Sequence, residues 1–139
     1  MIYGVGVDIA AVARLETLYT RHGEMGMDRI LAAAEQEDFL RLGEERRGRF
    51  LARRWAAKEA FGKALGTGLR PPATLTALCV DHDALGKPGF IFSPELQARM
   101  EELGLRAHLS ISDEARYAIA FVTLEQIVEP GVQSAWRAP

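Results

Sequence analysis

The segment from Phe50 to Gly68, FLARRWAAKEAFGKALGTG, constrains the fold more than any other part of the chain. Most of its residues are good helix formers, so it predicts one long helix. Gly66 and Gly68 end this helix, because glycine readily adopts the left-handed conformation that follows a last helical turn. Residues at helical spacing form two adjacent stripes: one of Leu51, Trp55, Glu59 and Lys63, and an apolar one of Phe50, Ala57, Phe61 and Ala64. The rest of the chain must cover the apolar stripe.

Glu59 is the exception in the first stripe, because its carboxylate lies in line with Leu51 and Trp55 and leans towards a core. A charge in that position needs a partner, a metal ion or a catalytic role. The structural alternative is a pair between Glu59 and Lys63 at i,i+4, which stabilises an exposed helix by about 0.2–0.5 kcal/mol. The helix alone leaves both interpretations open.

The segment from Ile2 to Ile9 alternates as a strand does, with Tyr3, Val5, Val7 and Ile9 on one face and Ile2, Gly4, Gly6 and Asp8 on the other. Two glycines on one face indicate that another backbone or a ligand approaches closely there. Asp8 ends that face and is either a functional carboxylate or the N-cap of the next helix. GVGVDI is not a dinucleotide-binding motif, because Ile9 stands at the third glycine position.

Shorter patterns predict the remaining elements. An amphipathic helix is expected from about Ala10 to Arg21, and short helices over 28–34 and 35–42. Strands are expected over 73–80 and 90–92, followed by a helix that Ser93 caps and that runs to about Leu103. Segments 106–112 and 115–124 predict an antiparallel hairpin, with His108, Ser110 and Ser112 on one face of its first strand.

These elements together predict an α+β fold, with an antiparallel sheet packed on one long helix plus shorter helices. The chain has 139 residues and a net charge of −2, which suits one globular domain, expected over 1–128. Residues 129–139 contain two prolines and are expected to form a loose tail. No apolar run approaches the ~20 residues of a membrane span. The start has no basic leader, and the single Cys79 cannot form an internal disulfide, so a cytoplasmic protein is expected.

Six arginines lie between Arg41 and Arg54, against only Glu44 and Glu45. Such a run is either a solvated face or a site for phosphate groups, whose oxygens match the guanidinium fork. A small RNA-binding domain is disfavoured, because the net charge is negative and aromatic residues do not alternate with the arginines. No nucleic acid or membrane partner is therefore expected.

The unusual residues share one chemistry. Mg²⁺ is commonly held by one or two carboxylates together with substrate phosphates and water. Asp8, Glu59, Lys63 and the arginines are the groups expected for a magnesium–diphosphate substrate. Zinc is disfavoured, because three scattered histidines and one cysteine offer no ligand spacing. The G-x-S-x-G motif of a serine hydrolase is absent from the sequence.

The chain resembles the holo-acyl-carrier-protein synthase family, the small 4′-phosphopantetheinyl transferases, from Met1 to about Leu124. The resemblance rests on GVGVDI followed by Arg14, on the long helix motif, on Gly86-Lys87-Pro88 and on HLSISDE from His108. Many family members have histidine where Asp113 stands. The resemblance implies transfer of the 4′-phosphopantetheine arm of coenzyme A to a serine of an acyl carrier protein. Adenosine 3′,5′-bisphosphate would be the other product.

The resemblance also implies roles for individual residues. Asp8 and Glu59 would hold Mg²⁺, Lys63 would offset charge on the diphosphate, and Glu59 would accept the serine proton, which makes these three the expected catalytic residues. Coenzyme A would be the co-substrate, with its 3′-phosphate facing Arg46, Arg54 and His108. The expected nucleotide-binding residues also include Lys63, Gly66, Thr67, Gly68, Lys87, Pro88 and Ser110.

Family resemblance further implies a homotrimer with active sites between neighbouring subunits. The glycines of the first strand, if exposed for close approach, would suit that arrangement. Arg14 and Arg21 would contact the acidic carrier protein. The alternative is a non-catalytic module that binds acyl carrier protein or coenzyme A. Retention of Asp8, Glu59 and Lys63 together argues against such a module, because a binder does not need a metal pair.

Overall fold

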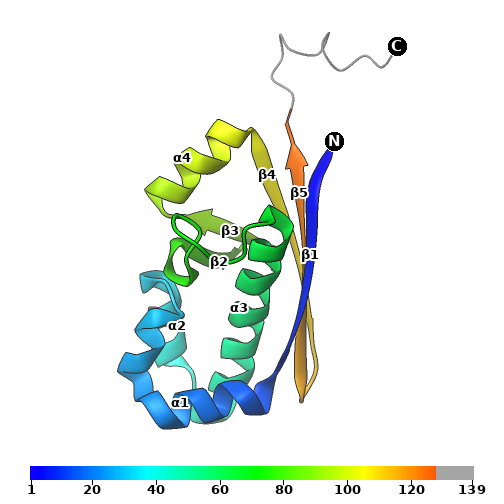
Figure 1. Ribbon diagram of the computed structural model, residues 1–139. Coiled ribbons are helices and arrows are strands. Elements are labelled where there is room, and N and C mark those ends of the chain that lie inside the picture. Colours follow the sequence, from blue (N-terminus) through cyan, green and yellow to red (C-terminus); the bar gives the residue numbers. More distant parts are fainter. Residues whose placement is uncertain (128–139) are drawn as a thin grey trace, which may run out of the picture.

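The computed structural model describes residues 1–127 (Figure 1). The elements, in chain order, are β1 (Ile2–Ala11), α1 (Val12–Gly26), the 3-10 turn η1 (Met27–Arg29), α2 (Ala33–Arg41), α3 (Glu44–Leu65), the 3-10 turn η2 (Leu75–Ala77), β2 (Leu78–His82), β3 (Pro88–Phe92), α4 (Pro94–Leu103), β4 (Leu105–Asp113) and β5 (Tyr117–Gln126). Within residues 1–127, no helix is both long enough and apolar enough to cross a membrane. The expected tail over 129–139 lies outside the described residues.

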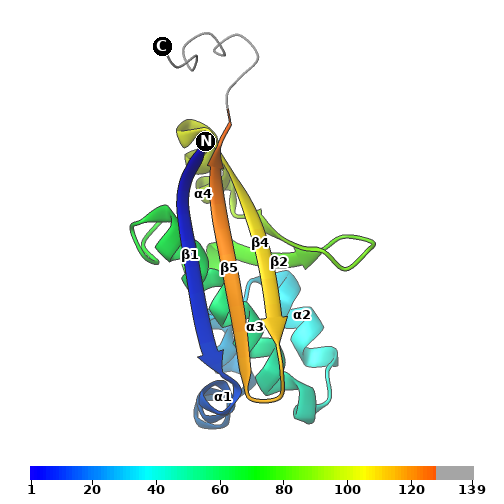
Figure 2. The same ribbon diagram turned by 90° about the vertical axis from the view of Figure 1, so that its right-hand side faces the viewer.

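Two antiparallel sheets flank the long helix. The larger sheet has the order β1-β5-β4, and β2 pairs with β3 in a separate two-stranded sheet. Helix α3 lies along one face of the larger sheet, and the β2–β3 hairpin projects to the side (Figures 1 and 2). Buried residues of α3, including Leu51, Ala57 and Phe61, form the centre of the core. The predicted α+β class is confirmed.

The two glycines of β1 let the strand lie directly against the backbone of α3. A Cβ atom at Gly4 would come within 1.9 Å of the Ala64 carbonyl oxygen, and one at Gly6 within 2.0 Å of the Ala60 oxygen. The close approach predicted from the sequence is therefore confirmed, with α3 as the approaching backbone. The idea that these glycines are exposed for a neighbouring subunit is wrong, because the chain's own helix covers them.

The other face of the larger sheet, here called the outer face, carries exposed apolar side chains. Its members on β1 and β5 are Tyr3, Val5, Val7, Ile9, Tyr117, Ile119 and Phe121. None of the helices within residues 1–127 covers this face, which Figure 2 shows turned towards the viewer. Exposed apolar patches of this kind mark interaction surfaces.

Several element boundaries differ from those predicted. Helix α3 begins at Glu44, before Phe50, and segment 73–80 is a 3-10 turn followed by β2. The helix expected over 28–34 does not form, since this segment contains the end of η1 and the start of α2, whereas the helix expected over 35–42 is confirmed as α2, which begins at Ala33. The Ser93 cap is confirmed, because its Oγ accepts a hydrogen bond from Leu96 N at 3.3 Å.

Candidate active site

Asp8 and Lys63 meet where β1 crosses α3. Lys63 Nζ donates to Asp8 Oδ1 at 3.1 Å and to the Val7 carbonyl oxygen at 3.0 Å. Asp8 lies on the same face of β1 as the glycines, so its side chain points towards the helix. Both structural alternatives are wrong: α1 has Ala11 as its N-cap, and within residues 1–127 the ion pair of Lys63 is with Asp8 and not with Glu59.

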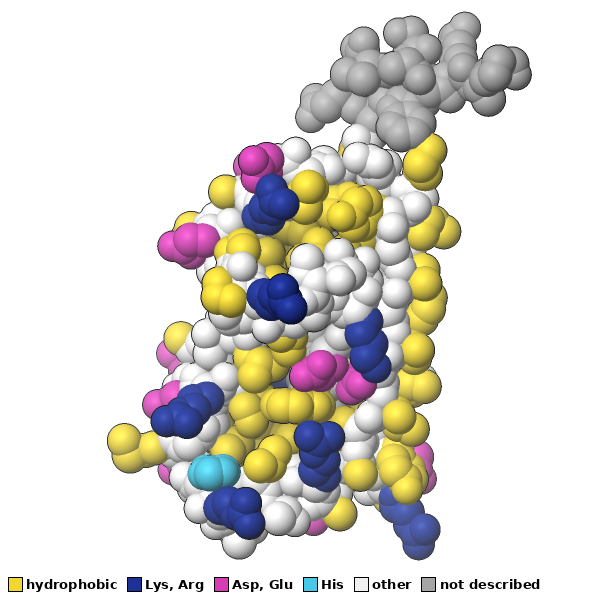
Figure 3. Space-filling view, in the orientation of Figure 1, with side chains coloured by type: hydrophobic (Ala, Val, Ile, Leu, Met, Phe, Trp, Pro, Cys, Tyr) yellow, Lys and Arg dark blue, Asp and Glu magenta, His cyan; other side chains and the backbone are white. Residues whose placement is uncertain are grey.

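Glu59 lies one helical turn before Lys63 and is partly buried. Burial raises the pKa of its carboxyl group, and the nearby charge of Asp8 raises it further. Lys63 and Arg14 act in the opposite direction. Asp8 and Glu59 thus interact electrostatically although they are far apart in sequence. Figure 3 shows acidic side chains together on this face, with basic side chains around them.

The two carboxylates fit a magnesium ion that is shared with a substrate. Mg²⁺ prefers oxygen ligands and commonly keeps water and substrate phosphates in its shell. Within residues 1–127, no group of three or more His, Cys, Asp or Glu side chains could enclose a metal by itself. Asp8 and Glu59 would therefore supply part of a coordination shell, and phosphate oxygens with water would supply the rest.

Arg14 connects this site to α1. Its guanidinium carbon lies 5.5 Å from the centroid of the Trp55 ring, a cation–π contact between α1 and α3. Trp55 precedes Glu59 by one turn, so Arg14 lies beside the carboxylates. Arg21 is exposed further along α1. The predicted partner-binding arginines therefore occupy a helix that borders the site.

Arg54 lines a separate cavity of about 420 Å³. Gly86 and Pro88 of the β2–β3 turn, His82, Arg53 and Asp113 also line it. The Arg54 side chain is 6% exposed, and its Nε has no hydrogen-bond partner in the described part of the chain. Burial lowers the pKa of this guanidinium, although Glu35 opposes the effect. Arg54 thus comes together with the predicted nucleotide-binding turn.

The arginine run of 41–54 is not one solvated face. Arg47 is buried and donates to Tyr19 Oη at 2.6 Å and to Glu24 Oε1 at 2.8 Å. Arg49 and Arg53 both donate to the carboxylate of Asp113. Burial alone would raise the pKa of Asp113, but these two hydrogen bonds hold it below its ordinary value.

The structure leaves other predicted residues apart from the carboxylates. His108 and Ser110 pair with Thr123 and Phe121 of β5 and lie on the outer face, opposite α3. His108 Nε2 is 3.5 Å from Glu125 Oε2. Arg46 is exposed on the first turn of α3 and does not line the Arg54 cavity. Within one chain, His108, Arg46 and Arg54 therefore do not form a single phosphate site.

The remaining nucleotide-binding candidates lie in two exposed loops. Gly66 and Gly68 adopt left-handed conformations after α3, and Thr67 Oγ1 donates to the Gly68 carbonyl oxygen at 2.9 Å. Lys87 is exposed in the β2–β3 turn, where its backbone N–H donates to Asp83 Oδ1 at 2.9 Å. These loops present backbone groups to solvent.

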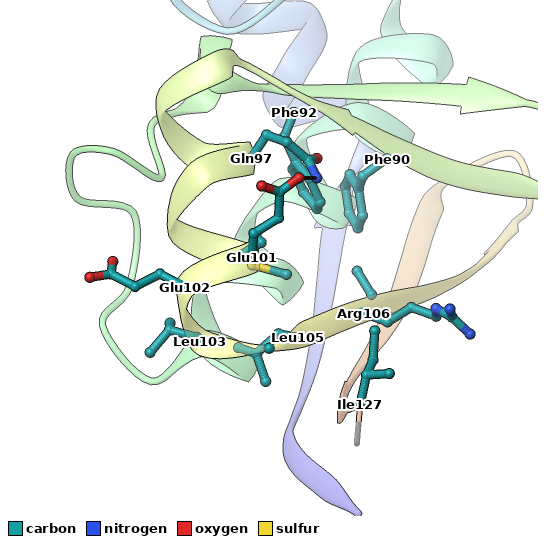
Figure 4. A pocket seen from close by; sticks show the side chains of 12 residues that line it. Phe90, Phe92, Gln97, Glu101, Glu102, Leu103, Leu105, Arg106 and Ile127 are labelled. Atoms are coloured by element: carbon teal, nitrogen blue, oxygen red, sulfur yellow. Dashed lines mark hydrogen bonds between the residues drawn. The ribbon is translucent and has the colours of Figure 1, made fainter. Parts of the chain in front are cut away.

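A larger cavity of about 630 Å³ lies elsewhere, between α4, β3 and β4 (Figure 4). Phe90, Phe92 and Leu105 line it, together with Glu101, whose Oε1 accepts a hydrogen bond from Gln97 at 2.9 Å. None of the predicted site residues lines this cavity. Its size alone does not make it the active site, because the carboxylates and the lysine lie outside it.

The sequence interpretation missed a buried ionic cluster behind the site. Lys58 is 0% exposed and Glu35 is 1% exposed. Lys58 Nζ donates to Glu35 Oε1 at 2.5 Å. The sequence carries little sign of this pair, because both residues also suit exposed positions on amphipathic helices.

Comparison with known proteins gives one consistent result. The family model described as the 4′-phosphopantetheinyl transferase superfamily matches residues 4–122. The holo-[acyl-carrier-protein] synthase of Dechloromonas aromatica is 56% identical over 125 residues, which cover 90% of this chain and 98% of that protein.

Solved structures of similar fold agree with this family match. The holo-[acyl-carrier-protein] synthase of Neisseria meningitidis has a TM-score of 0.85 and 43% identity, covering 90% of this chain and 99% of that one. The enzyme of Bacillus anthracis, in complex with CoA (3′,5′-ADP), has a TM-score of 0.77 and 35% identity, covering 91% and 99%.

Proposed function

Since the chain belongs to the 4′-phosphopantetheinyl transferase superfamily, we infer that it transfers the 4′-phosphopantetheine group of coenzyme A to a serine of apo-acyl carrier protein. The products are holo-acyl carrier protein and adenosine 3′,5′-bisphosphate. The observation that carries this proposal is the contact of Asp8 with Lys63 beside Glu59, in a chain that matches the family over residues 4–122.

The reaction forms a bond from the serine oxygen to the phosphorus that bears pantetheine, and breaks the bond from that phosphorus to the oxygen of the adenosine-bearing phosphate. Glu59 accepts the serine proton as the general base. Lys63 lies against Asp8 and faces the charge that develops on the leaving phosphate. Asp8 and Glu59 would hold a Mg²⁺ ion, which would supply charge neutralisation at the diphosphate.

Coenzyme A binding involves residues on both sides of α3. Arg54 contacts the 3′-phosphate from the cavity that Gly86 and Pro88 line. The loop from Gly66 to Gly68 and Lys87 approach the nucleotide. Arg46, His108 and Ser110 complete the site from the surface of a neighbouring copy, because in their own chain they lie apart from Arg54.

A homotrimer with shared sites agrees with the outer face. Its exposed apolar residues on β1 and β5 lie next to His108 and Ser110 on β4. Burying this face against another copy would remove apolar surface from water and place His108 at a subunit boundary. The support for the trimer is thus the apolar sheet face and not the glycines of β1.

Acyl carrier protein docks on α1 through Arg14 and Arg21, since Arg14 already lies over Trp55 beside the carboxylates. The alternative, a module that binds the carrier or coenzyme A without transfer, has no use for the contact between Asp8 and Lys63. The single cysteine of the sequence agrees with a reducing compartment, and we propose the cytoplasm.

One experiment separates transfer from binding. Purified protein is incubated with coenzyme A, Mg²⁺ and an apo-acyl carrier protein, and the carrier is weighed by mass spectrometry. We expect the carrier to gain the mass of a phosphopantetheine group, with matching release of adenosine 3′,5′-bisphosphate. Glu59→Gln serves as the inactive control. Carrier binding without any mass gain, across fatty-acid and polyketide carriers, would favour the non-catalytic module.

A further inference from the structure

The carboxylate of Glu35 on α2 lies close to two buried cations of α3, Lys58 and Arg54. The exposed fractions of Glu35, Lys58 and Arg54 are 1%, 0% and 5%. Lys58 Nζ lies 2.5 Å from Glu35 Oε1, whereas Arg54 Nε lies 3.6 Å from Glu35 Oε2. Burial lowers the pKa of Lys58, and Glu35 opposes this effect. With both cations protonated, the three side chains carry one negative and two positive charges, which leaves a net positive charge inside the protein. Buried charge of this kind needs a partner or a function.

Glu35 contacts Lys58 more closely than it contacts Arg54. Its amino group also donates to the Ile30 carbonyl oxygen at 2.6 Å, which ties Lys58 to the residue that follows η1. Glu35 accepts two backbone N–H groups as well, from Ala32 at 2.9 Å and from Val80 at 3.0 Å. With those contacts made, the carboxylate is directed at Lys58 and two backbone segments, and Arg54 lies beyond hydrogen-bond distance.

Arg54 is thereby left only partly neutralised. Its Nε is buried without a hydrogen-bond partner among residues 1–127, and its guanidinium lies 4.1 Å from the centroid of the Phe50 ring. Two other carboxylates line the same cavity, and each pairs with a different arginine. Asp38 lies 3.9 Å from Arg41, and Asp113 binds Arg49 and Arg53.

We propose that Lys58 is a positioning residue that engages Glu35 and so keeps the Arg54 guanidinium available to the 3′-phosphate of coenzyme A. The proposal rests on the proposed function, in which Arg54 contacts that phosphate. Lys58 itself is fully buried and touches no substrate. Its effect is to prevent Glu35 from closing on Arg54 as a complete ion pair, which would leave a phosphate dianion with a neutralised partner.

The test compares coenzyme A with 3′-dephospho-coenzyme A, which lacks only the phosphate in question. Dissociation constants for both are measured by calorimetry on the full chain with Mg²⁺. Lys58→Met removes the cation while its side chain still fills the space, and Lys58→Gln keeps a donor for the Ile30 carbonyl. We expect both variants to bind coenzyme A about threefold more weakly or worse, with 3′-dephospho-coenzyme A little affected.

Arg54→Met completes a double-mutant cycle. It should weaken coenzyme A binding about 10- to 100-fold, the range for a hydrogen bond to a charged group. The ratio to compare is the dissociation constant of 3′-dephospho-coenzyme A divided by that of coenzyme A. In the Arg54→Met background, Lys58→Met should have no further effect on this ratio. Leu31→Val is the matched control. Leu31 is a neighbour of Ile30 and is 0% exposed. Its substitution should lower the melting temperature through lost packing alone and leave the ratio unchanged.

The outcomes distinguish the role of Lys58 from the contact of Arg54 with the 3′-phosphate and from the proposed function. If Arg54→Met lowers the ratio and neither Lys58 variant does, the role of Lys58 is overturned while the 3′-phosphate contact stands. If Arg54→Met leaves the ratio unchanged, the contact and the role of Lys58 both fail. If wild-type protein binds neither nucleotide, the proposed function fails, and the roles of Arg54 and Lys58 fail with it.

Discussion

Lys63 Nζ lies 3.1 Å from Asp8 Oδ1, across the contact between the long helix and the first strand. The contact is possible because Gly4 and Gly6 let the strand lie on the helix backbone at Ala60 and Ala64. Packing that concerns only glycine and alanine thus sets the separation of the carboxylates of the site. Fold and chemistry are coupled through this one strand–helix crossing.

Gly6→Ala tests that coupling. The added Cβ would lie 2.0 Å from the Ala60 carbonyl oxygen, which belongs to helix backbone and cannot move alone. We expect a loss of about 1–3 kcal/mol in the free energy of unfolding, measured by urea denaturation, and a fall in kcat as the strand shifts. Gly89→Ala is the control, because a Cβ there meets no atom within 4 Å. Equal stability of the two variants would contradict the close contact.

Removing either carboxylate tests the metal assignment. Asp8→Asn and Glu59→Gln should each lower kcat about a hundredfold or more at saturating substrate, since each would remove an anionic oxygen ligand of the proposed Mg²⁺ ion. Lys63 is half exposed, so loss of its pair with Asp8 should change the free energy of unfolding by about 1 kcal/mol or less. Activity is measured against Mg²⁺ concentration. Glu102→Gln on α4 is the control, and wild-type rates for either site variant would remove the assignment.

The sequence predicts the elements of this crossing well, because their signals are local. The period of the long helix, the two glycines on one strand face and the hairpin of β4 and β5 each follow from neighbouring residues. The meeting of Asp8, Glu59 and Lys63 is implied by the family resemblance and not by these local signals, and in the structure Lys63 contacts Asp8 one helical turn after Glu59.

What the sequence does not reveal depends on distant partners. Lys58 is buried because Ile30 and Glu35 reach it from another segment, and the same residue type at Lys63 is half exposed. The alternation around His108 defines two faces of a strand, but it does not say which face α3 covers. The solvated-face interpretation of the arginines fails for the same reason, since Asp113 lies on a strand far along the chain.

Asp113 should give a pH-dependent contribution to stability. Its pKa is lowered from 3.8 in the folded protein by hydrogen bonds from Arg49 and Arg53, which outweigh its burial. A depressed carboxyl pKa stabilises the fold fully above pH 3.8, and this contribution is lost as the pH falls through the folded-state value. Asp113→Asn should therefore cost about 1 kcal/mol at pH 7.

The measurement is urea unfolding of both proteins across the acidic range. The difference between wild type and Asp113→Asn should shrink as the pH falls below 3.8. A difference that stays constant down to the most acidic pH at which both fold would show that packing, and not the ion pairs, is responsible.

Phe121→Lys tests the outer face as a subunit interface. Phe121 is 47% exposed at the centre of the larger sheet, with Val7 and Ser110 paired on either side of it. A lysine there would place a charge in a buried apolar contact, so we expect monomers by light scattering and a matching loss of transfer activity. Ile91→Lys on β3 is the control, because Ile91 is also exposed but lies off this face. Dissociation by the control alone would place the interface elsewhere.

Arg14→Ala should act on one substrate only. Arg14 lies over Trp55, on a helix that borders the carboxylates, and it is exposed, so its charge is accessible to an acidic carrier protein. We expect a severalfold rise in the KM for the carrier protein, with the KM for coenzyme A unchanged. The effect should shrink with added salt, because screening weakens the same attraction in the wild type.

Arg99→Ala on α4 is the control, since Arg99 is exposed and pairs with Glu102. An equal rise in both KM values for Arg14→Ala would mean that the residue supports the catalytic site as a whole, through Trp55, and does not dock the carrier.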